Sequence, residues 1–283
     1  MKLCRIERSS IILAFAMIFV VYMAQSITTP NVSAMPESIT TNKLVYQPGQ
    51  TVTVTGSDFA PNAQVTVQML FNLSATSSSS KATLASTTDG AGGLSKSWSL
   101  VSTADLGTYT VLAKNATTGA VLAKCHFGVW NLDKTAYERT QKVTVKGGGA
   151  KISSSVTVDF SGPGATVSKT KTTDDVGRWT IEWNTRNDTA LGTWTATLSG
   201  YAYDSPNPSF SYEKDFTIKK ATIAIGITTD KASYQRTETI KINATATYPN
   251  GTSIKTSVSV RLNMTVGTTK MLSAVSMTYN TTI

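Results

Sequence analysis

Cys125 and His126 are adjacent residues whose side-chain types could do nucleophilic chemistry. His126 is the only histidine of the chain, and Cys4 is the only other cysteine. A thiol activated by an imidazole is the arrangement used in cysteine-dependent acyl transfer. Successive residues of a β-strand point to opposite faces, however, so two neighbouring side chains cannot hydrogen-bond to each other. The residues that share the parity of Cys125 are apolar: Val121, Ala123, Phe127 and Val129. We therefore predict that Cys125 is a buried core residue, that His126 faces the other side, and that the pair is not catalytic.

Acidic residues offer a second kind of chemistry, because grouped carboxylates bind Ca²⁺. The candidates are Asp89 with Asp105, and Asp174 and Asp175 with Asp188. No D-x-[DN]-x-[DN]-G loop occurs, and an aspartate close to a glycine is an ordinary turn residue. Zinc would need clusters of histidine and cysteine that the sequence lacks. We predict no metal, no cofactor and no catalytic residue, and hence a protein that is not an enzyme.

Asparagines followed by x-Ser/Thr have the form of N-glycosylation acceptors. Such triplets fit an exported chain better than a cytosolic one, although a chain rich in Thr and Ser also forms them by chance. The candidate acceptors are Asn72, Asn115, Asn187, Asn243, Asn250, Asn263 and Asn280.

The formal net charge of +9 raises the question of an anionic partner. Basic residues stand singly rather than in blocks, as at Lys134, Lys142, Lys146, Lys151, Lys169 and Lys171. Attraction to an anionic wall polymer, a lipid surface or a nucleic acid is one interpretation. Ordinary solvated strand faces are the other, and the lack of a dense basic run favours it. We predict no nucleic-acid partner.

Alternation of apolar and polar residues is the dominant pattern among the elements that position these side chains. It is seen in runs such as 51–55, 65–71, 143–145, 156–160 and 240–246. Alternate side chains of a strand share a face, so each run has one buried and one wet side. Turn residues recur about every 8–12 residues, as in β-sandwiches. Glycine tracts at 90–93 and 147–149 are expected to be hairpin ends rather than phosphate-binding loops. The predicted fold class is all-β, with tandem immunoglobulin-like β-sandwiches.

Two repeated phrases divide the chain into related units. The first occupies 42–54 and returns at 133–145 and 230–242. The second, Thr-Thr-Asp followed later by Leu-Gly-Thr, begins at Thr87 and returns at Thr172. A period of about ninety to a hundred residues matches a small domain. We predict sandwiches at 35–130, 131–220 and 221–283. The third is expected to be incomplete and to expose strand edges, because the second phrase does not recur before Ile283.

Residues 1–34 are predicted to be a signal peptide or signal anchor. Lys2, Arg5 and Arg8 precede an apolar run over 11–24, which is shorter than the roughly 18–20 residues of a spanning helix. The short run favours cleavage over anchoring, and in both cases the following domains lie outside the cell. We predict an extracellular or cell-surface protein. It would touch the membrane only through this segment or through an anchor beyond Ile283.

Large aromatic residues recur at matching places behind the second phrase. They are Trp98, Tyr109, Trp179, Trp183 and Trp194. Stacking platforms for sugars are one interpretation of such residues. Repetition at equivalent positions of homologous domains favours the other, which is core filling.

The opening phrase Lys43-Leu44-Val45-Tyr46-Gln47-Pro48-Gly49-Gln50-Thr51-Val52 resembles the first strand of macroglobulin-type and related immunoglobulin-like domains. So does the later run Asp89…Gly92…Leu106-Gly107-Thr108-Tyr109. Such modules stand in tandem in prokaryotic, and especially archaeal, cell-surface proteins. Arg139-Thr140 and Arg236-Thr237 replace the Pro-Gly of the phrase in its later copies. Macroglobulin protease traps carry a thioester motif, Gly-Cys-Gly-Glu-Gln, which Lys124-Cys125-His126-Phe127 does not match, so no thioester role is implied.

These features together predict a non-catalytic, exported surface protein whose tandem modules serve as a stalk, envelope component or adhesive module. Short linkers are expected near Asn131 and Lys220. The alternative is a carbohydrate-binding accessory region of a longer surface enzyme. The partner would be an extracellular protein or a polysaccharide.

Overall fold

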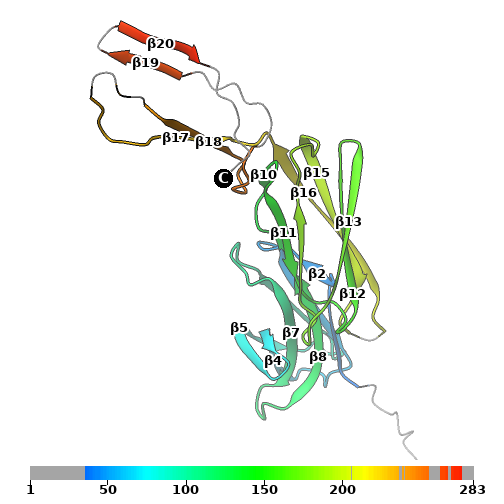
Figure 1. Ribbon diagram of the computed structural model, residues 1–283. Helices are drawn as coiled ribbons and strands as arrows, with labels where there is room; N and C mark the ends of the chain where they lie inside the picture. The colour runs from blue at the N-terminus through cyan, green and yellow to red at the C-terminus, as the bar shows by residue number, and fades with distance from the viewer. Residues whose placement is uncertain are drawn as a thin grey trace, which may run out of the picture. The chain divides into compact units, whose positions relative to one another are not determined.

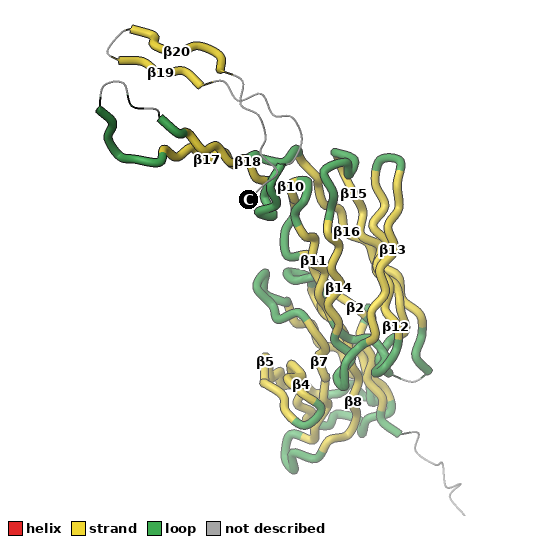
Figure 2. Tube along the Cα trace, viewed as in Figure 1, coloured by secondary structure: helices red, strands yellow, loops and turns green. Residues whose placement is uncertain are grey.

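The computed structural model describes residues 36–204, 206–235, 238, 240–254, 262–266 and 269–275, and every regular element in them is a β-strand (Figures 1 and 2). The predicted all-β class is therefore confirmed. The leader predicted at 1–34 lies outside the described residues. Within them there is no helix that is long and apolar enough to cross a bilayer.

The first sandwich packs a five-stranded sheet against a three-stranded sheet. The larger sheet has the order β2-β8-β7-β4-β5 and the smaller one the order β1-β3-β6. All neighbours are antiparallel except β2 and β8, which are parallel. The strands are β1 (Ser38–Thr41), β2 (Val45–Tyr46), β3 (Thr51–Ser57), β4 (Gln64–Ser74), β5 (Ser77–Thr87), β6 (Leu94–Ser99), β7 (Gly107–Asn115) and β8 (Val121–Val129).

The second sandwich repeats this arrangement strand for strand. Its sheets have the orders β10-β16-β15-β12-β13 and β14-β11-β9, again with one parallel pair, β10 with β16. The strands are β9 (Asn131–Leu132), β10 (Ala136–Glu138), β11 (Lys142–Gly147), β12 (Ser155–Gly162), β13 (Ala165–Thr172), β14 (Trp179–Asn184), β15 (Gly192–Tyr201) and β16 (Ser209–Lys219). Only Trp130 separates β8 from β9.

Alternating apolar residues fill both cores as the sequence pattern predicts. In β4, Val65, Val67 and Met69 are buried while the residues between them are half-buried or exposed. β12 does the same with Val156, Val158 and Phe160. Each such side chain, removed from water, contributes about 1.5–3 kcal/mol to folding. The sandwiches are therefore stabilised by their cores, with no disulfide among the described residues.

The opening phrase recurs because it encodes a small hydrogen-bond network. Asn42 Oδ1 accepts hydrogen bonds from Tyr46 Oη (2.7 Å) and from the backbone N–H of Thr53 (2.8 Å). Tyr46 Oη in turn accepts one from the backbone N–H of Lys43 (3.0 Å). This network ties the chain before β2 to β3, and burial raises the pKa of the Tyr46 phenol to about 12. The second copy of the phrase forms the same three bonds, with Asp133 as the acceptor, Tyr137 as the tyrosine, and the backbone N–H groups of Lys134 and Thr144 as donors. The third copy forms them with Asp230, Tyr234, and the N–H groups of Lys231 and Lys241.

The second repeated phrase encodes a turn and a corner. Asp89 Oδ1 accepts hydrogen bonds from the backbone N–H groups of Ala91 (2.8 Å) and Gly93 (2.7 Å). Asp174 Oδ1 does the same with Val176 and Arg178. At the corner, Tyr109 Oη donates to the carbonyl of Asp105 (3.1 Å), and Trp194 Nε1 donates to that of Ala190 (3.0 Å). A buried aromatic tied back to backbone four residues upstream is the corner device of immunoglobulin-like sandwiches.

Beyond residue 220 the structure describes two separate strand pairs. β17 (Ala224–Thr229) pairs with β18 (Ile242–Thr247), and β19 (Leu262–Val266) with β20 (Thr269–Val275). Every residue of β17 is exposed, including Ile225 (63%) and Ile227 (52%). The incompleteness and the exposed strand edges expected in 221–283 stay a prediction.

Candidate functional site at the junction of the two sandwiches

Glycines bring the backbones of the two sandwiches into direct contact. The Gly147–Gly149 tract begins at the last residue of β11 and lies against Gly107, Thr108 and Gly128 of the first sandwich. A methyl group on Gly148 would lie 2.3 Å from the carbonyl carbon of Gly107, and one on Gly128 would lie 2.0 Å from the carbonyl oxygen of Gly148. Only glycine permits such an approach. The prediction that 147–149 and 90–93 are hairpin ends is wrong, because each tract connects a strand of one sheet to a strand of the other.

Thr108 supplies the central polar contact of this junction. Its side chain is completely buried, and its hydroxyl donates a hydrogen bond to the carbonyl of Val176 (2.5 Å). The same hydroxyl accepts one from the backbone N–H of Gly149 (2.8 Å). Both polar groups of the second sandwich are thus satisfied by one residue of the first. Separation of the sandwiches would leave these groups without protein partners.

His126 and Asp204 form a second polar contact. β2 pairs with β8 only at Gly128 and Val129. His126 lies before the first paired residue of β8, so its backbone N–H has no partner in β2. Asp204 Oδ2 accepts a hydrogen bond from this N–H (2.6 Å), and Asp204 Oδ1 lies 2.5 Å from His126 Nδ1. The ring of Tyr203 packs on the imidazole, with ring centroids 4.3 Å apart. The His126 side chain, which points away from its own core, is therefore only 10% exposed.

Apolar contacts complete the junction on the side of β2. Val45 belongs to the five-stranded sheet of the first sandwich, yet its side chain is buried in the core of the second. Trp130, the residue between β8 and β9, is fully buried in that same core. The backbone N–H of Leu44 donates to Tyr212 Oη (3.3 Å). The short linker expected near Asn131 is thus a packed segment with no free length.

The predicted core position of Cys125 is confirmed. It is 7% exposed, and burial, followed by the negative charge of Asp204, raises the pKa of its thiol to about 12. Ala123, Phe127 and Val129 are also buried, but Val121 is 53% exposed, and the prediction fails there. An irregularity in the pairing of β7 and β8 next to Val121 shifts it out of the core face. Cys125 and His126 point to opposite faces, as predicted.

Cys125 should therefore be almost unreactive in the folded protein. At pH 8 we expect a thiol reagent such as 5,5′-dithiobis-(2-nitrobenzoic acid) to label native protein at least about a hundredfold more slowly than unfolded protein, since the thiolate is the reactive species. Absorbance at the released thiol's wavelength, with and without denaturant, measures both rates. Equal rates would contradict the buried position of the thiol.

The other predicted site residues have structural roles where the structure describes them. Trp179, Trp183, Trp194 and Tyr109 are buried, and Trp98 is half-buried against the core, so the core-filling interpretation is confirmed. Asp89 and Asp174 cap turns, and Asp105 pairs with Lys81 (2.7 Å). Among the described residues, no three His, Cys, Asp or Glu side chains are grouped to hold a metal ion.

The predicted glycosylation acceptors differ in accessibility. Asn187, Asn243 and Asn250 are exposed. Asn72 and Asn115 are half-buried, and each accepts hydrogen bonds through its side-chain oxygen, Asn72 from Thr110 and Asn115 from two backbone N–H groups. The side chain of Asn263 and all of Asn280 lie outside the described residues. Modification of these residues stays a prediction.

Strand order, the two cores and the junction define this chain as a tandem immunoglobulin-like β-sandwich protein. No protein-family model and no curated protein matches it. Among solved structures, it is similar to a tetra-tandem repeat from the extending region of a large adhesion protein, with 15% identity and a TM-score of 0.29. That match covers 77% of this chain and 65% of the other.

Two further solved structures are similar at the same level. One is trypsin-activated alpha-2-macroglobulin from Escherichia coli, with 17% identity, a TM-score of 0.28, and coverage of 88% of this chain and 21% of that one. The other is a teleost fish polymeric immunoglobulin receptor ectodomain, with 11% identity, a TM-score of 0.26, and coverage of 64% and 96%. TM-scores this low carry no inference about function or partners. The sandwich assignment rests on the strand pairing itself.

Proposed function

We propose that this chain is a non-catalytic, exported surface protein whose sandwiches act as a stalk, envelope component or adhesive module. The observation that supports this role is the junction between the first two sandwiches. Backbone-to-backbone glycine packing, the buried Thr108 and the paired His126 leave no free linker there. Two modules joined in this way transmit force and orientation from one to the other. A protein that must hold a distal element away from a surface needs that property.

The geometry of the junction should also make it resist bending. Rotation of one sandwich against the other would break the contacts of Thr108 and Asp204 together, and it would expose Val45 and Trp130 to water. Close-packed interfaces do not deform continuously, because small displacements forfeit much of the contact energy. We therefore expect a single orientation of the two sandwiches in solution.

Spin-label distances test this proposal. Labels at Val121→Cys and Ala165→Cys, both exposed positions on different sandwiches, would be attached in a Cys125→Ala background. Double electron–electron resonance should give one narrow distance distribution. Asp204→Ala should broaden it and weaken the junction by about 1.5 kcal/mol, because the N–H of His126 loses a charged acceptor. A distribution as broad in the parent as in the variant would contradict a fixed junction.

Asp188→Ala is the matched control, since it removes an exposed carboxylate in a turn of the second sandwich. It should leave the distance distribution unchanged. Export is tested separately: protease treatment of intact cells that express the full chain should digest it, whereas protection until lysis would contradict an exported location.

A further inference from the structure

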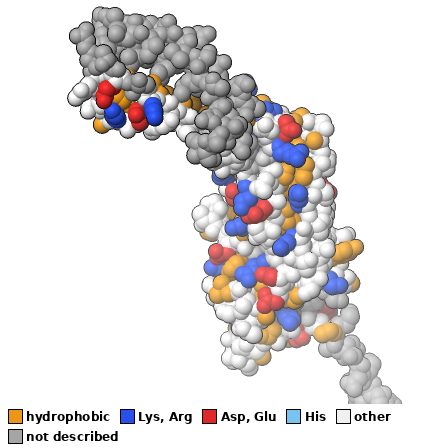
Figure 3. All heavy atoms as spheres, viewed as in Figure 1, with side chains coloured by type: hydrophobic (Ala, Val, Ile, Leu, Met, Phe, Trp, Pro, Cys, Tyr) orange, Lys and Arg blue, Asp and Glu red, His pale blue; other side chains and the backbone are white. Residues whose placement is uncertain are grey.

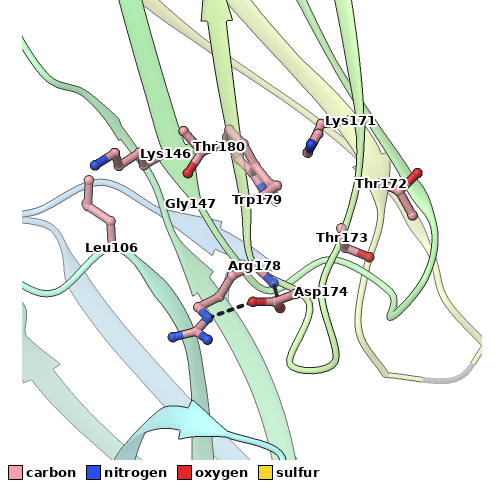
Figure 4. A pocket seen from close by; sticks show the side chains of 10 residues that line it. All are labelled: Leu106, Lys146, Gly147, Lys171, Thr172, Thr173, Asp174, Arg178, Trp179 and Thr180. Carbon is pink, nitrogen blue, oxygen red and sulfur yellow. Dashed lines mark hydrogen bonds and ion pairs between the residues drawn. The ribbon is translucent and has the colours of Figure 1, made fainter.

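A basic groove runs along the open side of the second sandwich, between the edge strands β13 and β14. One part has a volume of about 480 Å³ and the next, which shares Lys171 and Thr180 with it, about 430 Å³. In the view of Figure 4, Trp179 lies between Lys146 and Lys171. Charged residues over the face of the molecule seen in Figure 3 are mixed in sign.

Lysines of β13 reach the groove because of their register. Lys169 and Lys171 pair with Val158 and Val156 of β12, whose side chains are in the core. They share the parity of Val167, which packs against the same core. Cross-strand partners point to the same face of a sheet, so both lysines leave β13 on its core-facing side, where they are exposed at the open edge of the sandwich and line the groove.

The charges of the groove do not balance. Its basic residues are Lys146, Lys169, Lys171 and Arg178, and its acidic residues are Asp174 and Glu182. Arg178 pairs with Asp174 (3.0 Å), and Glu182 pairs with Lys142 (2.7 Å), so both carboxylates are already engaged. Among the described residues, no ion pair or hydrogen bond of the side chain is formed by Lys146, Lys169 or Lys171. The groove therefore presents three uncompensated ammonium groups.

Trp179 adds an unsatisfied donor at the same place. It is 4% exposed, and its indole N–H is buried without any hydrogen-bond partner. Buried indole N–H groups usually have a partner, because an orphaned donor is costly. Trp194, by contrast, has its N–H satisfied by backbone. The nitrogen itself is closed to solvent, so an acceptor on a ligand in the groove would remove the cost only if the indole turned toward it.

The first sandwich shows that the fold itself does not require this arrangement. In its corresponding strands, Leu84 and Ser86 stand in place of Lys169 and Lys171, and Leu94 in place of Trp179. Leu84 packs against the first core. Lysines on an edge strand can protect against edge-to-edge pairing, and the equivalent strand β5 carries one, Lys81, but that lysine is paired with Asp105 (2.7 Å). The lysines and the indole are thus special to the second sandwich.

We propose that this groove binds the carboxylate or sulfate groups of an acidic polysaccharide. A site with three unpaired ammonium groups, whose two carboxylates are already engaged in ion pairs, selects an oxyanion. Exposed hydroxyls of Thr172 and Thr180 line the same groove and suit sugar hydroxyls. The only aromatic lining residue is almost fully buried, so no ring face is available to stack a nucleic-acid base. A recessed groove without apolar projections likewise does not suit a flat lipid surface.

Binding by the full chain to polygalacturonate and to dextran sulfate tests this inference, with neutral dextran for comparison. We expect the acidic polymers to bind and neutral dextran not to bind, with an affinity that falls as salt is added. Preference between the two acidic polymers would identify carboxylate or sulfate as the group recognised. Lys169→Leu/Lys171→Ser, which installs the residues of the first sandwich, should lower the affinity at least about tenfold. Trp179→Phe, which removes the N–H together with part of the ring, should lower it about threefold or more.

Lys124→Ser is the control, since Lys124 is an exposed lysine of the first sandwich. The affinity of this variant for the acidic polymers should stay within about twofold of the parent's. Equal affinity of the parent and the double lysine variant would overturn the proposal, as would binding of neither acidic polymer. Tighter binding to duplex DNA or to phosphatidylglycerol vesicles would overturn the choice of ligand. The inference rests on the proposed exported location, where such polymers occur. Its failure would leave the spin-label test of the junction unaffected.

Discussion

Gly148→Ala should uncouple the two sandwiches while each keeps its fold. The added methyl would lie 2.3 Å from the carbonyl carbon of Gly107 and 2.4 Å from the backbone nitrogen of Thr108. Backbone atoms cannot swing aside as the end of a flexible side chain can, so the sandwiches must move apart. Overpacking of this kind costs about 1–3 kcal/mol, and the loss of the Thr108 contacts adds to it. Calorimetry should therefore change from one coupled unfolding transition to two.

Gly90→Ala is the matched control for that experiment. No atom lies within 4 Å of the position that its methyl would occupy. The Gly90→Ala variant should keep the single coupled unfolding transition, and its melting temperature should differ little from that of the parent. Retention of a single transition by Gly148→Ala would contradict the view that the glycine tract holds the junction together.

Local patterns in the sequence were enough to predict the fold. Alternation places Val65, Val67 and Met69 in one core, and the repeated phrases mark equivalent positions of the two sandwiches. Even the turn role of Asp89 follows from its residue type and its neighbours. Each of these features depends on contacts within a few residues or between adjacent strands, and such contacts leave a periodic trace in the sequence.

The junction and the groove could not be predicted in the same way. Thr108 meets Val176, and His126 meets Asp204, across long stretches of chain that no period relates. The one visible signal was the Gly147–Gly149 tract, which the first sandwich lacks at the corresponding place.

The lysines of the groove show a different limit. Lys169 and Lys171 look like solvated charges when they are counted singly. Which side of β13 they share with Val167, and hence that they line the groove, is seen only once the register of β13 with β12 is known.

Trp194→Ala should unfold the second sandwich at temperatures at which the parent is stable. Its side chain is 1% exposed, packs against Trp183 with ring centroids 4.9 Å apart, and covers Gly162. Replacement of a buried tryptophan by alanine leaves a large cavity and costs about 3–5 kcal/mol. That is a large share of the roughly 5–15 kcal/mol by which a typical domain is stable. Denaturant titration followed by tryptophan fluorescence should show the loss as a lower midpoint.

Trp194→Tyr and Trp194→Phe separate the contribution of the ring from that of its hydrogen bond. The first sandwich has Tyr109 at this place, and its hydroxyl donates to the carbonyl of Asp105 as Trp194 donates to that of Ala190. Tyrosine should therefore recover most of the stability, and phenylalanine about 1 kcal/mol less, since it cannot donate. Labelling of Cys125 reports chiefly on the first sandwich, because that thiol lies in its core and burial is the main cause of its low reactivity. If Cys125 of the Trp194→Ala variant became reactive at the same denaturant concentration at which the tryptophan fluorescence changed, the two cores would unfold as one unit. A fluorescence midpoint close to that of the parent would contradict the core role of Trp194.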